Sequence, residues 1–166
     1  MITAAVLTLS DKGSKGERED LAGPIIREMI TEIGATVEYY AVIPDERGLI
    51  TERLIEYSNK VDLVITTGGT GLSPRDVTPE ATREVIDREI PGIAEAMRLA
   101  GLEKTKRAML SRAVAGVRGK TLIINLPGSP KAVREGLEAV MDVIPHAIEK
   151  ISGSTEDCAV QGGKEQ

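Results

Sequence analysis

Aromatic residues are nearly missing from this sequence, which has no Phe, no Trp and only three Tyr among 166 residues. Few rings are therefore present to sandwich a flavin or to stack on unpaired bases, and this disfavours flavoproteins and single-strand binders. The formal net charge of −5 creates no general attraction for DNA, RNA or anionic lipid. Any phosphate that the protein binds must meet a local site, and we expect no nucleic-acid partner.

Cysteine and histidine occur once each, as Cys158 and His146. One cysteine cannot form an intramolecular disulfide. The one histidine lies deep in the last helical pattern, so we expect neither a Ser-His-Asp triad nor a His-rich zinc site. No apolar run approaches the ~20 residues that a membrane helix needs. The first residues also lack the basic segment of a signal peptide. We therefore expect a cytoplasmic protein with no membrane partner.

Four segments are typical of strands, and three of them are nearly continuous apolar runs, as in parallel strands that are covered on both faces. They are residues 2–9, 36–43, 61–67 and 121–126. Between and after them, apolar residues recur at helical spacing over residues 21–33, 50–57, 79–88, 93–100, 105–111 and 133–151. This alternation predicts an α/β fold in three layers, with helices on both faces of a doubly wound, mostly parallel sheet.

Residues typical of turns, helix caps and helix bends refine this prediction. Residues 113–117 and 121–126 flank Arg118-Gly119-Lys120, a pattern typical of a hairpin, which would insert one antiparallel strand. Asp20 and Thr78 are plausible N-caps for the helices that follow them, and Pro145 is expected to bend the last helix. The length fits one domain, over residues 1–152, and we expect the polar residues 153–166 to be a disordered tail.

Ligands of such sheets bind beyond the carboxyl ends of the strands, which directs attention to four loops. The richest is Thr67-Gly68-Gly69-Thr70-Gly71, whose glycine amides can form an anion-binding nest. Ser73 adds a hydroxyl, Arg75 a cation and Asp76 a carboxylate before the next helix begins. The pattern predicts a phosphate and cation site. The alternative is a glycine-rich turn in which Asp76 bonds local backbone.

The other three loops are ambiguous when taken alone. Pro127-Gly128-Ser129 could hold a phosphate at a helix N-terminus, but Ser129 as a helix cap explains the turn equally well. Asp45 is also explained as a cap, although with Asp76 it could hold Mg²⁺ if the two loops converge. Ser10 and Asp11 fit either a turn or a ligand contact, and residues 12–20 fit either a flap or a solvated loop.

Two apparent nucleotide motifs are incomplete. Gly119-Lys120-Thr121 has the ending of a P-loop, but Val114 stands where a glycine is required and a strand follows. Gly69-Thr70-Gly71 lacks the third glycine of a dinucleotide fingerprint, since position 74 is proline. Neither a P-loop nor a nicotinamide site is therefore expected.

The segment around the glycine loop closely resembles the signature of the MoaB/Mog family of molybdenum-cofactor biosynthesis proteins. The matching stretch is Thr66-Thr67-Gly68-Gly69-Thr70-Gly71-Leu72-Ser73-Pro74-Arg75-Asp76-Val77-Thr78-Pro79-Glu80-Ala81-Thr82. Shorter matches are Leu9-Ser10-Asp11, Asp20-Leu21-Ala22-Gly23, Val42-Ile43-Pro44-Asp45, Ser111-Arg112-Ala113-Val114-Ala115-Gly116 and Asn125-Leu126-Pro127-Gly128-Ser129-Pro130. The resemblance spans residues 1 to about 152 and favours the stand-alone form of this molybdopterin-binding domain.

The resemblance implies a molybdopterin adenylyltransferase with ATP and molybdopterin as substrates. Asp45 and Asp76 would serve catalysis and bind Mg²⁺. The substrate-binding residues would be Ser10, Asp11, Thr67, Gly68, Gly69, Thr70, Gly71, Ser73, Pro127, Gly128 and Ser129. A homotrimer or homohexamer is implied as well, with the molybdate-inserting enzyme as a candidate partner.

The residues themselves are compatible with this chemistry, because phosphoryl-type transfer needs mainly positioning and charge stabilisation. A phosphate nucleophile is ionised near neutral pH, so the shortage of histidine is no obstacle. Two alternatives remain open at this point. One is a molybdopterin-binding or scaffold protein without nucleotidyl transfer, and the other is a general binder of nucleotides or sugar phosphates.

Overall fold

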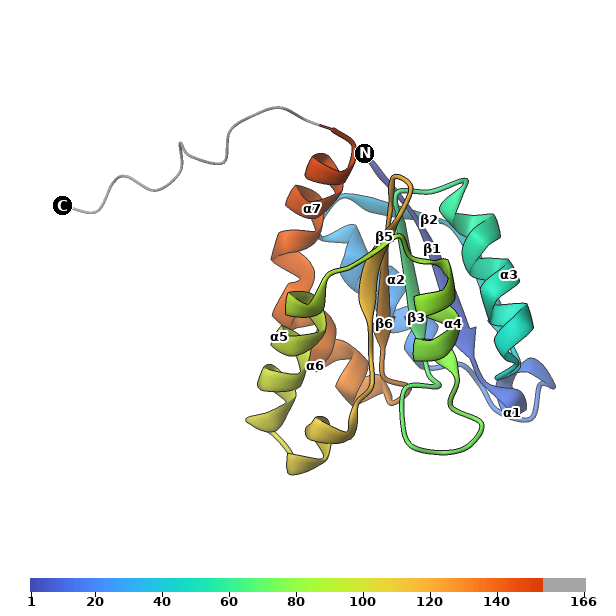
Figure 1. Cartoon of the computed structure of the whole chain (residues 1–166). Coiled ribbons are helices and arrows are strands. Elements are labelled where there is room, and N and C mark those ends of the chain that lie inside the picture. The colour runs from blue at the N-terminus through green and yellow to red at the C-terminus, as the bar shows by residue number, and fades with distance from the viewer. Residues whose placement is uncertain (154–166) are drawn as a thin grey trace.

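The computed structural model describes residues 1–153 as a six-stranded sheet between two layers of helices (Figure 1). The strand order is β2-β1-β3-β6-β5-β4. The strands are β1 (Ile2–Leu9), β2 (Ala35–Ile43), β3 (Leu63–Thr67), β4 (Arg88–Glu89), β5 (Ala115–Arg118) and β6 (Thr121–Leu126). The tail predicted to be disordered lies, apart from Gly153, outside the described residues, as does Cys158.

The sheet is mixed, as the sequence predicts. Strand β1 pairs in parallel with β2 and β3, and β3 pairs in parallel with β6. Strand β5 runs antiparallel to both of its neighbours, β6 and β4. The predicted hairpin is therefore confirmed. Strand β4 was not predicted from the sequence, because two exposed residues carry no periodic pattern.

Two apolar layers sandwich the sheet, since the central strands β3 and β6 are buried along their whole length. One layer holds α2, α5, α6 and α7, and the opposite layer holds α3 and α4 (Figure 1). The helices are α1 (Asp11–Ser14), α2 (Ala22–Thr31), α3 (Arg47–Ser58), α4 (Thr78–Val85), α5 (Pro91–Leu102), α6 (Pro130–Val140) and α7 (Ile144–Ile151), with 3₁₀ helices η1 (Lys106–Leu110) and η2 (Met141–Val143). The three-layer prediction is confirmed.

Some boundaries differ from the sequence prediction. Residues 11–14 form a helical turn in a segment expected to be loop, because the hydroxyl of Ser10 accepts a hydrogen bond from the amide of Gly13. The last predicted helix is interrupted by η2 directly before Pro145, which lacks the amide that would continue the helix. Helix α4 ends at Val85, three positions before the expected end near Arg88.

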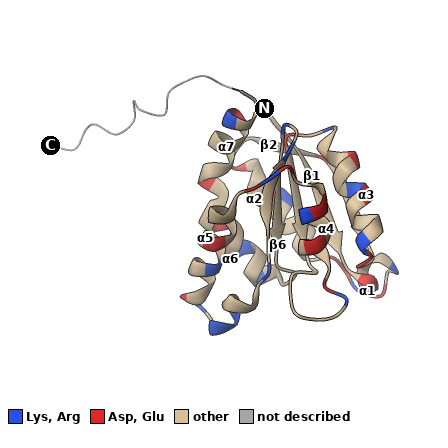
Figure 2. Cartoon of the chain, viewed as in Figure 1, with Lys and Arg blue, Asp and Glu red and all other residues tan. Residues whose placement is uncertain are grey.

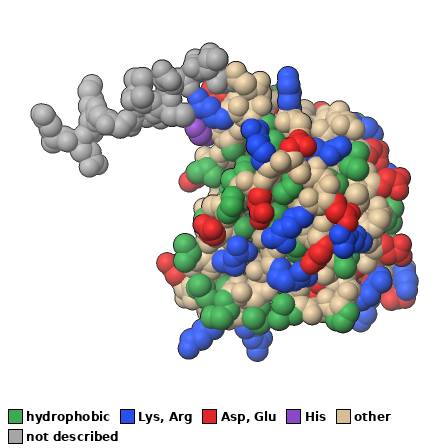
Figure 3. Space-filling view, viewed as in Figure 1, with side chains coloured by type: hydrophobic (Ala, Val, Ile, Leu, Met, Phe, Trp, Pro, Cys, Tyr) green, Lys and Arg blue, Asp and Glu red, His purple; other side chains and the backbone are tan. Residues whose placement is uncertain are grey.

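Most charged residues lie on the helices and loops, and the central strands β3 and β6 carry none (Figure 2). Exposed apolar side chains gather over α5 and η1, at the lower left of Figure 3. They are Leu99, Leu102, Met109 and Leu110. Across the described residues, none of the helices has the length and apolar character needed to cross a membrane.

Candidate active site

The glycine loop leaves β3 beside the point where the chain order of the sheet reverses, between β1 and β3. Gly68 and Gly69 have positive φ angles of 96° and 67°, a conformation that L side chains rarely adopt. The side chain of Thr78 donates a hydrogen bond of 2.9 Å to the carbonyl oxygen of Gly68. A Cβ atom on Gly68 would collide with the carbonyl oxygen of Leu9. The loop is therefore held tightly and requires glycine at both positions.

The turn after β6 packs against this loop. The hydroxyl of Thr67 donates a 2.7 Å hydrogen bond to the carbonyl oxygen of Pro127. The Gly68 amide donates a 3.1 Å hydrogen bond to the carbonyl oxygen of Leu126. A Cβ on Gly128 would lie 3.3 Å from the Cα of Gly68. The hydroxyl of Thr67 thus joins two backbone segments, and the two glycine-bearing loops form one surface.

Asp11 and Asp45 bind each other's backbone across the ends of β1 and β2. The amide of Asp11 donates to Oδ2 of Asp45 at 3.1 Å, and the amide of Asp45 donates to Oδ1 of Asp11 at 3.0 Å. Arg75 donates two hydrogen bonds to the carboxylate of Asp11, one of 3.0 Å from Nε and one of 2.8 Å from Nη2. The side-chain hydrogen bond from Arg75 holds the pKa of Asp11 below its usual value.

Asp45 has unusual surroundings for a carboxylate. Its Oδ1 atom is buried and has no hydrogen-bond partner. Burial raises the pKa of Asp45, and the nearby charges of Asp11 and Asp76 raise it further, against a lowering by the Asp11 amide. Such an orphaned oxygen calls for an explanation, and a bound cation would supply one.

Asp76 lies at the far end of the glycine loop. Its Oδ2 atom accepts a 2.9 Å hydrogen bond from the amide of Ser73, and a Cβ on Gly71 would stand 2.9 Å from that same oxygen. Asp76 therefore does bond local backbone, as the turn interpretation requires. Asp76 also lies near Asp45, at the edge of a shared cavity, so a local turn does not account for its whole environment.

Two cavities meet at the glycine loops. The first, the acidic cavity, has a volume of about 770 Å³ and is lined by Ser10, Asp11, Asp20, Asp45, Gly68 and neighbouring residues. The second, the helix cavity, has a volume of about 510 Å³ and lies between the glycine loops, α5, η1 and α6. Both are lined by Gly69, Asp76, Gly128 and Ser129. Asp45 and Asp76 thus share the acidic cavity, as the sequence hypothesis required.

The other candidates from the sequence divide between the two cavities. Thr67 lines the acidic cavity, whereas Thr70, Gly71 and Pro127 line the helix cavity. Ser73 lines neither; its hydroxyl accepts a 3.3 Å bond from the amide of Arg75.

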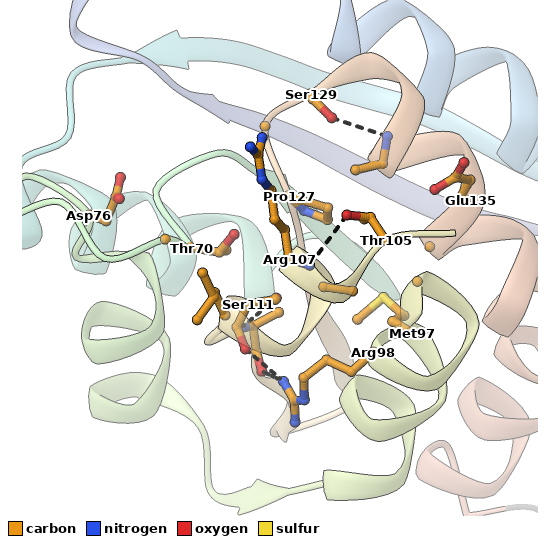
Figure 4. Close-up of a pocket in the computed structure, with 18 of the residues that line it drawn as sticks. Thr70, Asp76, Met97, Arg98, Thr105, Arg107, Ser111, Pro127, Ser129 and Glu135 are labelled. Carbon is orange, nitrogen blue, oxygen red and sulfur yellow. Dashed lines mark hydrogen bonds between the residues drawn. The ribbon is translucent and has the colours of Figure 1, made fainter. Parts of the chain in front are cut away.

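The helix cavity contains residues that carry no functional signal in the sequence. Arg107 extends from η1 toward the turn at Ser129, and Met97 and Arg98 reach the cavity from α5 (Figure 4). The guanidinium of Arg98 donates to the carbonyls of Ser111 and Ala113, at 3.3 and 3.2 Å. Only the proximity of η1 to the glycine loops identifies Arg107, and no local sequence signal carries that information.

Three interpretations based on helix capping or free charge need correction. Asp45 does not cap α3, because its Oδ2 accepts from Asp11 and the capping position, Glu46, makes no side-chain bond. Thr78 does not cap α4, because its hydroxyl donates to Gly68 instead. Arg75 is not a free cation for phosphate, because Asp11 holds it. The cap at Ser129 is confirmed by a 3.2 Å bond from the amide of Ala132.

Asp20 organises the rim of the acidic cavity. Its Oδ1 accepts from the amides of Ala22 and Gly23, both at 3.1 Å, so it performs the capping predicted for it, although Leu21 occupies the capping position. Its Oδ2 accepts from Thr8 at 2.7 Å and from the hydroxyl of Tyr40. Burial alone would raise the pKa of Asp20, but these hydrogen bonds outweigh it and lower the pKa below 3.8. Burial and the bond to Asp20 raise the pKa of Tyr40 to about 12.

We expect Asp20→Asn to lower the free energy of unfolding by about 1–2 kcal/mol at pH 7, because the substitution removes a charged acceptor of several hydrogen bonds. The folded-state pKa of Asp20 is depressed, so its ionised form stabilises the protein above the unfolded-state pKa. That contribution is lost as the pH falls through the folded-state value, below 3.8. Urea unfolding from pH 7 downward should show the difference between variant and parent shrinking. A difference that stays constant with pH would contradict the ionic origin.

The residues at the acidic cavity fit a magnesium ion. Mg²⁺ is usually held by one or two carboxylates together with substrate phosphates and water. Asp45 offers a buried oxygen without a partner, and Asp76 lines the same cavity. Across the described part of the chain, no cluster of three or more His, Cys, Asp or Glu could hold a metal ion. A cation bound between Asp45 and Asp76 would therefore have to take its other ligands from substrate and water.

Comparison with known proteins identifies the family. Residues 5–146 match the family described as "probable molybdopterin binding domain". The chain belongs to this family of molybdenum-cofactor biosynthesis proteins. It is 47% identical over 157 residues to a molybdopterin adenylyltransferase of Helicobacter pylori, covering 92% of this chain and 89% of that protein.

Solved structures agree with this assignment. The crystal structure of the molybdopterin biosynthesis enzyme MoaB from Thermus thermophilus is 54% identical, with a TM-score of 0.88, covering 93% of this chain and 98% of that one. The tungsten cofactor synthesizing protein MoaB from Pyrococcus furiosus is 36% identical, with a TM-score of 0.84, covering 91% and 97%. Family members named for molybdenum and for tungsten therefore share this fold.

Proposed function

We propose that this protein catalyses the Mg²⁺-dependent transfer of AMP from ATP to the terminal phosphate of molybdopterin, with release of pyrophosphate. The relatives that are 47% and 42% identical are both named molybdopterin adenylyltransferase, and each alignment covers most of this chain. The observation that carries the proposal is the junction of two cavities at Gly69, Asp76, Gly128 and Ser129. An enzyme that joins two phosphate-bearing substrates needs such a junction.

The proposed reaction is an in-line displacement at phosphorus. A phosphate oxygen of molybdopterin bonds to the α-phosphorus of ATP, and the bond from that phosphorus to the bridging oxygen breaks, so that pyrophosphate leaves with the electron pair. The nucleophile is already ionised, so no side chain has to remove a proton. The chain's task is therefore to position the two substrates and to stabilise negative charge.

Each group at the junction has a role in this proposal. Asp45 and Asp76 would hold Mg²⁺, which when bound neutralises charge on the phosphates. The Gly68 amide is already bonded to Leu126, so the backbone amide of Gly69, in the loop shaped by the positive φ angles of Gly68 and Gly69, would donate to a phosphate oxygen. The N-terminus of α6, which begins at Pro130 and is capped by Ser129, would add the positive end of its helix dipole. Arg107 would add a cation from the helix cavity.

The decisive experiment incubates the purified full chain with molybdopterin, ATP and Mg²⁺ and follows adenylylated pterin and pyrophosphate. We expect both products in equal amounts and neither when Mg²⁺ is chelated. Tight pterin binding without either product would favour the scaffold alternative. Tight binding of an unrelated phosphometabolite, with none of pterin, would favour the general phosphate binder.

The remaining features implied by the family resemblance stay predictions. The exposed apolar patch on α5 and η1 supports association between copies of the chain, for which we propose a homotrimer or homohexamer. A cytoplasmic location and contact with the molybdate-inserting enzyme complete the proposal. Analytical ultracentrifugation would test the assembly directly.

A further inference from the structure

We propose that Arg112 is a positioning residue that fixes the glycine loop, and with it the carboxylate of Asp76, in the conformation used for catalysis. The catalytic part of this inference rests on the proposed adenylyl transfer. The conformational part does not, because it concerns the chain alone. Arg112 lies between η1 and β5, in the Ser111-Arg112-Ala113 segment, to which neither the comparisons nor the proposed reaction gives a role.

Arg112 reaches both ends of the loop. Its backbone amide donates to the carbonyl oxygen of Thr70 at 2.9 Å, and its Nε donates to the carbonyl oxygen of Gly71 at 2.8 Å. Its Nη2 donates to the carbonyl oxygen of Asp76, also at 2.8 Å. One side chain therefore ties the backbone at residue 71 to the backbone at residue 76, and the intervening Leu72 to Arg75 are exposed.

The guanidinium is itself anchored. Its Nη1 forms an ion pair with Oε1 of Glu80, in the first turn of α4. Burial opposes ionisation of Glu80, but the hydrogen bond from Arg112 lowers the pKa of that carboxyl below its usual value. Because α4 packs on the sheet, the ion pair with Glu80 fixes the position of the loop relative to the core of the fold. A planar fork of donors suits this task in a way that a lysine ammonium does not.

Arg112 lines neither the acidic cavity nor the helix cavity. Each of its three guanidinium nitrogens donates a hydrogen bond to an acceptor within the chain. Asp76, in contrast, lines both cavities. Arg112 must therefore act through the residues that it holds, and its loss should displace Asp76 without removing any substrate contact.

The test compares Arg112→Ala with Arg118→Ala. Arg118 is a matched control, because it is also partly buried and donates a 2.8 Å bond to a backbone carbonyl, that of Val85, at the end of α4 away from the glycine loop. We expect Arg112→Ala to lower kcat by about 10²-fold, since a small misplacement of a reacting group has that effect. The KM for ATP should change by less than about threefold, and Arg112→Lys should not restore kcat.

Two further readouts separate positioning from general destabilisation. Guanidinium chloride at low millimolar concentration should partly restore the kcat of Arg112→Ala, because it can occupy the vacated site, and should do nothing for Arg118→Ala. Hydrogen exchange of the substrate-free protein should accelerate at the amides of residues 68–77 in Arg112→Ala only. Equal losses of kcat and melting temperature in both variants, or unchanged exchange in this loop, would overturn the proposal. If the parent makes no adenylylated pterin, exchange still tests the conformational claim.

Discussion

Asp76→Asn is expected to lower kcat by about 10²–10³-fold, the range found when a single electrostatic contribution to a transition state is removed. The asparagine side chain keeps an oxygen that can accept the 2.9 Å bond from the amide of Ser73, so the local turn should survive. What it loses is the negative charge beside Asp45, which is proposed to bind Mg²⁺. The steady-state rate of adenylylated pterin formation, measured over a Mg²⁺ titration, checks this expectation.

A control variant separates catalysis from folding in this experiment. Asp142→Asn removes a carboxylate from an exposed position in η2, outside both cavities. Its kcat and its melting temperature should both match the parent. For Asp76→Asn, the melting temperature should stay close to the parent because the side chain is only partly buried and the asparagine oxygen keeps the bond from the Ser73 amide. Parallel losses of activity and melting temperature would make Asp76 a structural turn residue.

The architecture was predictable because it depends on signals that are local in the sequence. The runs that became β1, β3 and β6 are nearly continuous in apolar residues, and each is followed by glycine, proline or a short polar residue. The turn at Gly119 joins β5 and β6 as the sequence indicated, with a positive φ of 57°. Hydrophobic periodicity and turn chemistry therefore determined the sheet and its one reversed strand.

The partners of the charged residues were not predictable in the same way. Arg75 and Asp11 are 64 positions apart in the chain, and Arg112 and Asp76 are 36 apart. Nothing local shows that Arg75 is occupied by Asp11 and that Arg112 holds the glycine loop. A sequence pattern identifies a cation, but only the packing of α4 and η1 against the strand ends decides which acceptor it meets. The location of the candidate site could therefore be predicted from the sequence, whereas the partners of its charged residues could not.

Asp45 illustrates how the two kinds of information combine. A carboxylate that follows a strand and precedes a helix is most simply a cap, and locally nothing contradicts that interpretation. The reciprocal bonds with Asp11 take one carboxylate oxygen toward β1 and leave the other buried without a partner. An uncompensated oxygen of this kind is costly in an apo protein. The cost is reasonable if the site is completed by a cation during the reaction.

Gly69→Ala is expected to abolish most activity while lowering stability only moderately. Gly69 has a φ of 67°, so any L residue there is strained by roughly 1–2 kcal/mol. A Cβ at this position would also collide with the hydroxyl of Thr78 and stand 3.0 Å from the unpartnered Oδ1 of Asp45. It would fill the space beside the oxygen that is proposed to bind Mg²⁺. A loss of kcat/KM of at least about 10²-fold should follow, as for other misplaced catalytic groups.

Gly34→Ala isolates the backbone contribution to that loss. Gly34 has a φ of 75°, close to that of Gly69, but a Cβ there would meet no atom within 4 Å. Both variants therefore carry the same kind of strain, and urea unfolding should show a comparable part of the destabilisation in each. Only Gly69→Ala adds a methyl group to the site, so only Gly69→Ala should lose Mg²⁺-dependent turnover. If the two alanine variants retained equal activity, the space beside Asp45 would have no part in catalysis, and the orphaned oxygen would need a different explanation.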